Sequence, residues 1–81
     1  MDNAQRYFGK AELCRSLAAS EQNPKAYLDY IQAAEGFDKA AGMAKRGNSF
    51  LADIMAEHTL SSLVFNLWWH REAVPKLRRV A

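Results

Sequence analysis

The stretch from His58 to His70 constrains the fold of this chain most, because it is the most apolar segment and ends in two adjacent tryptophans. Neighbouring positions on an α-helix point about 100° apart, so Trp68 and Trp69 cannot both face one narrow core stripe. A chain of 81 residues has little other surface with which to cover a second side of that helix. The sequence therefore predicts a small helical protein with more apolar surface than one short bundle buries, covered by a second copy or another protein.

Length and composition indicate a single helical domain spanning residues 1–81. A domain of this size buries only about 60 to 65% of the surface that its unfolded chain exposes, so oligomerisation is a common source of added stability. Hydrophobic residues make up 49% of the chain and charged residues 25%, which is typical of a globular protein rather than a disordered one. The abundance of Ala, Leu, Lys, Arg, Glu and Gln favours helix over strand.

Apolar residues recur at helical spacing in three segments, at about residues 3–20, 24–46 and 49–71. Asn23 and Pro24 predict the start of the second helix, because Asn accepts a backbone N–H as N-cap and Pro lacks a donor that would have no partner there. Gly47 predicts its end in a left-handed conformation. An alternative joins the second and third helices through Gly47, but Gly-Asn-Ser is better suited to a turn than to a helix interior.

Pro75 predicts the end of the third helix. Proline disfavours α conformation at the preceding residue, so the helix should stop by Val74 and leave residues 75–81 as a short basic tail. The connections are short, so consecutive helices should lie antiparallel. We therefore predict an all-α, three-helix antiparallel bundle with a short basic C-terminal tail, completed by self-association.

Three small residues lie four apart on the second predicted helix: Gly36, Ala40 and Ala44. Their strip would permit close approach of another helix. The high helix propensity of alanine explains the two alanines equally well.

The first half of the chain carries a loose motif, Tyr7-x-x-x-Ala11-x-x-Cys14-Arg15-x-Leu17-Ala18, followed by Asn23-Pro24 and later by Phe37-x-x-Ala40-x-x-Met43-Ala44. This pattern resembles one in short uncharacterised helical proteins of alphaproteobacteria. The resemblance covers roughly residues 4 to 46, implies a helical hairpin, and implies no activity.

The residue types that usually carry chemistry are poorly placed for it. Cys14 lies on an apolar stripe, where a free cysteine is more often a small core residue than a nucleophile. His58 and His70 are twelve positions apart and point in different directions on one helix, so they do not converge on a metal. Asp53 and Glu57 share a helix face that is better explained by solvation. We therefore predict no catalytic, cofactor-binding or metal-ligating residues, no cofactor and no enzymatic activity.

Positive charge is concentrated at the end of the chain. The net charge is only +2, yet Arg71, Lys76, Arg78 and Arg79 lie close together against the single acid Glu72. One alternative is therefore a nucleic-acid-binding protein that uses the basic tail, with tryptophans stacking on bases. A second alternative is a helix lying on a membrane surface, since Leu, Phe and Trp beside Arg and Lys are typical of interfacial helices.

The function that we predict is protein binding or regulation by a non-enzymatic homodimer. Aromatic residues and arginine are enriched at protein interfaces. The four cations would steer and orient an acidic partner surface. The predicted partner or self-association residues are Leu60, Leu63, Val64, Phe65, Leu67, Trp68 and Trp69.

The sequence also bears on location. Cys14 is the only cysteine, no secretory signal or transmembrane segment is recognisable, and a cytoplasmic location follows by default.

Overall fold

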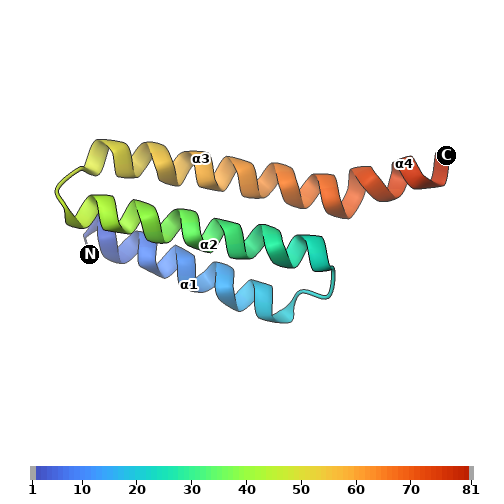
Figure 1. Cartoon of the computed structure of the whole chain (residues 1–81), viewed down its shortest axis with the longest axis horizontal. Coiled ribbons are helices and arrows are strands. Elements are labelled where there is room, and N and C mark those ends of the chain that lie inside the picture. Colours follow the sequence, from blue (N-terminus) through green and yellow to red (C-terminus); the bar gives the residue numbers. More distant parts are fainter. Residues whose placement is uncertain (1, 81) are drawn as a thin grey trace.

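The computed structural model describes residues 2–80 and confirms an all-α, three-helix antiparallel bundle (Figure 1). Met1 and Ala81, at the ends of the predicted domain and tail, lie outside the described residues. The molecule is elongated, with principal dimensions of 50 × 23 × 15 Å. The elements are α1 (Asn3–Ser20), α2 (Pro24–Lys45), α3 (Ser49–Trp68), a single π-helical segment η1 (Trp69–Ala73), and α4 (Val74–Val80).

The predicted helix boundaries are set by local capping. The Asn23 side chain accepts the backbone N–H groups of Lys25 and Ala26, and so caps α2 as predicted. Gly47 follows α2 with a φ of 82°, the left-handed conformation expected at a helix C-terminus. Asn48 occupies the N-cap position of α3 without a side-chain hydrogen bond. The turn between α2 and α3 is therefore real, and the alternative of one continuous helix is wrong.

Helix α2 is the centre of the bundle. Both α1 and α3 pack along it, whereas α1 and α3 touch each other little (Figure 1). A direct link between those two is the Tyr7 hydroxyl, which donates a hydrogen bond to the Asp53 carboxylate. The resulting arrangement is a helical hairpin, α1–α2, with α3 laid along its α2 side.

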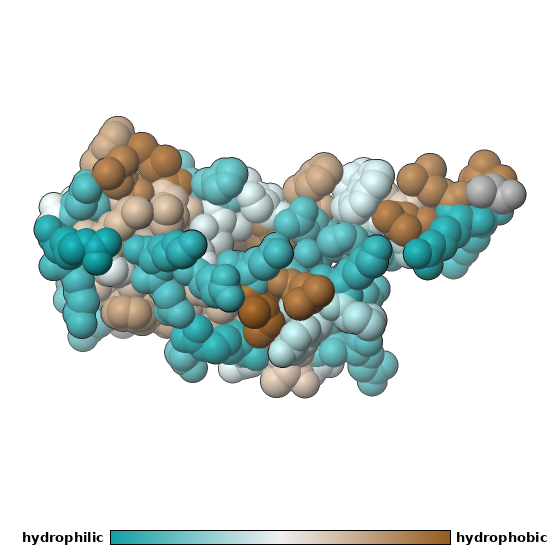
Figure 2. Space-filling model, viewed as in Figure 1, coloured by the Kyte–Doolittle hydropathy of each residue, from teal (hydrophilic) through white to brown (hydrophobic). Residues whose placement is uncertain are grey.

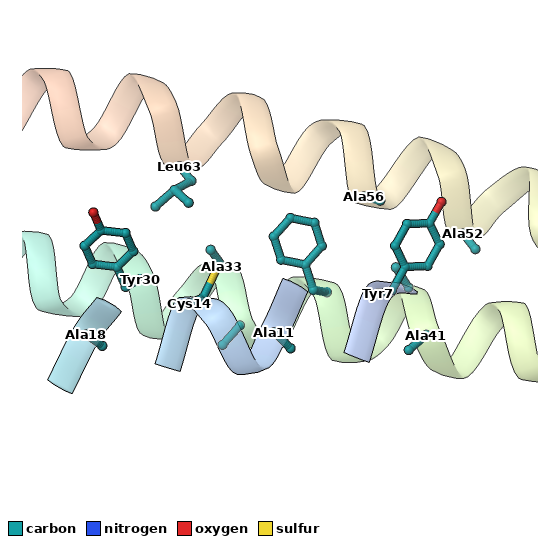
Figure 3. Packing of buried hydrophobic residues seen from close by; sticks show 13 residues of the cluster. Tyr7, Ala11, Cys14, Ala18, Tyr30, Ala33, Ala41, Ala52, Ala56 and Leu63 are labelled. Carbon is teal, nitrogen blue, oxygen red and sulfur yellow. The ribbon is translucent and has the colours of Figure 1, made fainter. Parts of the chain in front are cut away.

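The core is made largely of alanine. The fully buried residues are Ala11, Ala26, Ala40, Ala41 and Ala52, each with 0% exposure. Tyr7, Tyr30 and Leu63, which are 5 to 9% exposed, are the larger side chains labelled in the core (Figure 3). Small side chains let helices approach closely but remove little apolar area from water per residue. Many of the large apolar side chains are consequently on the outside, as the sequence predicts.

The C-terminal region differs from the prediction. A third helix ending near residue 71 and a non-helical tail were expected, but α3 passes through η1 into α4, which continues to Val80. In η1 the Val74 N–H donates to the Trp69 carbonyl, five residues back. Pro75 then stands in the first turn of α4, where its missing N–H and fixed φ are tolerated. Pro75 therefore shifts the hydrogen-bond register and bends the helix instead of ending it.

Candidate functional site

The side of α3 opposite α2 is an exposed apolar surface. The buried positions of α3 are Ala52, Ala56, Thr59 and Leu63, so its helical period turns the intervening positions outward. We call the solvent side the outer face; its residues are Phe50, Ile54, Glu57, Ser61, Val64, Phe65 and Trp68. Figure 2 shows hydrophobic residues at both ends of the edge formed by α3 and α4, with hydrophilic and near-neutral residues between them.

Three exposed rings lie close together where α3 meets η1. Phe65 and Trp69, one helical turn apart, stack at 11° with centroids 6.4 Å apart. Trp68 lies 5.9 Å from the Phe65 centroid and 6.2 Å from the Trp69 centroid. We call these three residues the aromatic cluster. Phe65, Trp68 and Trp69 remain 57%, 49% and 39% exposed, so the cluster is an ordered surface feature rather than part of the core.

A shallow, mainly apolar hollow lies beside the aromatic cluster. Its lining residues are Leu60, Ser61, Val64, Phe65 and Trp68. Ser61 is the smallest of these and is flanked by larger side chains. The outer face therefore carries a hollow that Trp68 itself helps to line.

Two polar contacts hold η1 on the hairpin and so fix the direction of the adjacent tryptophans. His70 Nδ1 lies 2.6 Å from a carboxylate oxygen of Asp29, which is only 5% exposed. Arg71 pairs with Glu21, donates to the Tyr30 hydroxyl at 3.3 Å, and lies 5.7 Å from the centre of the Tyr30 ring. We call the Asp29–His70 and Glu21–Arg71 contacts the anchor.

The anchor changes the ionisation of Glu21 and of Arg71. The backbone N–H of Asn23 and, after it, the Arg71 guanidinium lower the pKa of Glu21. Glu21 in turn raises the pKa of Arg71. Both charged forms are therefore favoured in the folded state.

The predicted interface residues divide into two groups. Leu60, Val64, Phe65, Trp68 and Trp69 are exposed. Leu63 lies in the core with 9% exposure and Leu67 is partly buried against that core, so neither belongs to the exposed surface. Helical geometry explains the position of Leu63, because it continues the buried series of Ala52, Ala56 and Thr59.

The predicted steering charges also divide. Lys76, Arg78 and Arg79 are exposed on α4, whereas Arg71 is committed to Glu21 and Tyr30. The sequence reading did not assign Phe50 to the interface, although it is 73% exposed. It also missed Asp29. Asp29 lies three residues after Ala26 and four before Ala33, so helical spacing places its carboxylate on the buried face of α2. That spacing could have identified Asp29 from the sequence.

The candidate chemical residues are dispersed. Cys14 is 4% exposed in the core, and burial raises the pKa of its thiol. His58 is exposed on α3, and Asp53 accepts the Tyr7 hydrogen bond. Among residues 2–80, no group of three or more His, Cys, Asp or Glu side chains could hold a metal ion.

The chain matches no protein-family model, no curated protein and no solved structure in the comparisons with known proteins. Within the described part of the chain, no helix has the length and apolar character needed to span a bilayer.

Proposed function

We propose that this protein is a non-enzymatic protein-binding or regulatory protein that acts through the outer face of α3 and forms a homodimer. The observation that carries the proposal is the aromatic cluster: three neighbouring, solvent-exposed rings, of which Phe65 and Trp69 are stacked, beside a core filled by alanine. Rigid aromatic side chains supply large contact area at low entropic cost, and they are enriched at interface hot spots. The setting that we propose is the cytoplasm, where the buried thiol of Cys14 stays reduced.

The exposed aromatic area is large enough to matter energetically. The aromatic residues of the outer face and the cluster together expose on the order of 400 Å², taking roughly 200 Å² for a whole aromatic side chain. At about 25 cal/mol per Å², covering that area is worth about 10 kcal/mol before the costs of association. This gain offsets much of the entropy lost when two proteins bind.

The charges near the outer face favour a protein partner over nucleic acid or a lipid surface. The exposed cations Lys76, Arg78 and Arg79 lie on α4, while on α3 Asp53 borders the outer face and Glu57 lies within it. A phosphate-rich surface laid along α3 would meet those two carboxylates. A protein surface of mixed charge would not be repelled.

The test is light scattering coupled to size exclusion over a wide concentration range, on the natural chain and on the double variant Trp68→Ala/Trp69→Ala. We expect the natural chain to be dimeric and the variant monomeric, with helicity by circular dichroism unchanged. The matched control is Leu13→Ala/Leu17→Ala, which removes two exposed apolar side chains from α1 and should leave the dimer intact.

Three results would count against the proposal. A natural chain that stays monomeric at all concentrations would overturn the homodimer, and a tryptophan variant that still dimerises would overturn the role of the cluster. Salt-sensitive binding to DNA or RNA that is lost on removing residues 76–81 would favour the nucleic-acid alternative. Flotation with anionic vesicles accompanied by a blue shift of tryptophan emission would favour the membrane-surface alternative.

A further inference from the structure

A stripe of polar side chains runs along α3 and η1 beside α2. The stretch that contains it is the most apolar of the chain, yet four of its polar residues lie four positions apart: His58, Ser62, Asn66 and His70. Residues four apart on a helix share a face. Together with residues of α2 they line two adjoining hollows, so that a polar groove follows the junction of the two helices.

Asp29 provides the only carboxylate of the deeper hollow, a pocket of about 160 Å³ between α2 and α3. Of the described residues, no lysine or arginine lines this pocket, and Lys25 lines the adjoining hollow next to His70 instead. Asp29 is only 5% exposed, on the buried face of α2 between Ala26 and Ala33. A carboxylate in such a position costs free energy of folding, and exceptions of this kind to local sequence rules gather at functional sites.

The anchor uses only one of the two carboxylate oxygens of Asp29. His70 Nδ1 lies 2.6 Å from Oδ2, and within residues 2–80 no other hydrogen bond to this side chain is present. Across the same residues no fully buried side-chain nitrogen or oxygen atom lacks a partner, so Oδ1 is not sealed from solvent. Because a carboxylate oxygen is an acceptor, Oδ1 is available to a donor that enters the groove.

The groups around Oδ1 suit a primary ammonium. Gln32, Ser62 and Asn66 line the pocket with Asp29, and each of these three neutral side chains has an oxygen that accepts hydrogen bonds. An ammonium has one positive charge and three N–H donors, one for Oδ1 and two for neutral acceptors. A guanidinium pairs best with both oxygens of a carboxylate, and His70 already occupies Oδ2.

The volume and the apolar wall of the pocket define what the ammonium is attached to. Ala33 and Leu63, both buried, give the pocket an apolar wall. A cavity of about 150 Å³ holds a molecule the size of benzene, which has about six non-hydrogen atoms. An alkyl chain of four carbons with a terminal nitrogen is within that limit.

We propose that the pocket between α2 and α3 binds a primary alkylammonium, with the nitrogen on Oδ1 of Asp29 and the alkyl chain against Ala33 and Leu63. Two sources present this chemistry: a free amine and the side chain of a lysine in another protein. The proposal goes beyond the proposed function, because none of the residues that line the pocket belongs to the outer face.

Titration with n-butylammonium chloride, followed by amide NMR signals, tests the proposal. Ionic strength is held constant with sodium chloride. We expect saturable shifts confined to the pocket, including the side-chain amides of Gln32 and Asn66, and affinity for n-butanol, the uncharged isostere, about tenfold or more lower. Absence of saturation, equal binding of n-butanol, or shifts spread over the carboxylates of the whole surface would overturn the proposal.

Asp29→Asn tests the role of the carboxylate. The amide oxygen still accepts the His70 N–H, whereas the amide NH₂ places a donor where the ammonium needs an acceptor. We expect affinity for n-butylammonium to fall about tenfold or more while circular dichroism is unchanged. Glu35→Gln, at an exposed position of α2, is the matched control and should leave the affinity unaltered. Unaltered affinity in a folded Asp29→Asn chain would contradict the proposal.

Ser62→Leu tests the pocket without changing Asp29, and it serves also if Asp29→Asn does not fold. The larger apolar side chain fills the space that the ligand needs, so we expect a similar loss of affinity. Ser16→Leu makes the same replacement at an exposed position of α1 and should have no effect. Binding by Ser62→Leu as tight as that of the natural chain would show that the ligand does not enter this pocket.

A short peptide, acetyl-Ala-Lys-Ala-amide, distinguishes the two sources of the ammonium. Binding of n-butylammonium without binding of the peptide supports the proposal and assigns the pocket to a free amine. Binding of both, each weakened by Asp29→Asn, supports it and assigns the pocket to a lysine of another protein. Binding of neither overturns it.

Discussion

Thr59 of α3 packs directly on Gly36 of α2. A Cβ atom on Gly36 would lie 2.5 Å from Thr59 Oγ1 and 2.8 Å from Thr59 Cγ2, so no larger residue fits without moving α3. Thr59 is β-branched and stiff at χ1, and its Cβ is itself only 3.2 Å from that position. The strip of small residues on α2 therefore permits close packing of α3 at Gly36. The helix propensity of alanine alone would not explain this contact.

Gly36→Ala should destabilise the protein relative to Gly9→Ala. Both changes improve helix propensity by about 1 kcal/mol, but only the first overpacks a helix contact, at a cost of about 1 to 3 kcal/mol. Nothing lies within 4 Å of the position that a Cβ on Gly9 would occupy, so Gly9→Ala should raise the urea midpoint. Equal midpoints for the two variants would show that α3 does not approach α2 closely at Gly36.

The sequence predicts the positions of the helices well, but it predicts less well which face of each helix is buried. Capping by Asn23 and the left-handed Gly47 are local effects, so two or three neighbouring residues determine them. Whether Leu63 points into the core depends on how α3 rotates against α2, which local sequence does not fix. Because α3 is apolar on nearly all sides beyond Leu60, its pattern does not distinguish the buried side from the exposed one.

The C-terminal region shows a second reason for failure. A rule that holds for most prolines predicted a helix end before Pro75. Instead, a π-helical turn precedes Pro75 and lets the helix continue although proline has no N–H to donate. The anchor was missed because it joins positions far apart in the chain: Asp29 with His70 and Glu21 with Arg71. Contacts of this kind follow from the packing of helices and cannot be read from residue spacing.

The stability effects of removing His70 and Asp29 should not be additive. His70→Ala leaves a nearly buried carboxylate without that partner, at a cost of about 1 to 3 kcal/mol. In the double variant Asp29→Ala/His70→Ala that penalty disappears, so urea unfolding of the four chains should give a coupling energy of at least about 1 kcal/mol.

The matched control for the histidine is His58→Ala, since His58 is exposed on α3 and the change should alter stability by less than about 0.5 kcal/mol. Near-ultraviolet circular dichroism of the tryptophans gives a second measurement, because His70 directly follows the aromatic cluster. We expect His70→Ala to alter that signal and His58→Ala to leave it unchanged. Strictly additive effects of Asp29→Ala and His70→Ala would contradict the pairing.

Acid should weaken the anchor through Glu21. Its pKa is lowered in the folded protein from the ordinary value of 4.5, by the backbone N–H of Asn23 first and then by Arg71. A carboxylate with a depressed folded pKa contributes stability that is fully present above its unfolded pKa and is lost as the pH falls through the folded value. The natural chain should therefore be more stable than Glu21→Gln at pH 6 to 7, and this difference should shrink steadily below about pH 4.5.

Urea unfolding at a series of pH values measures this difference in stability. The control is Glu35→Gln, because Glu35 is an exposed carboxylate of α2. A difference between the natural chain and Glu21→Gln that stays constant from neutral pH to pH 3 would show that the charged carboxylate does not stabilise the fold.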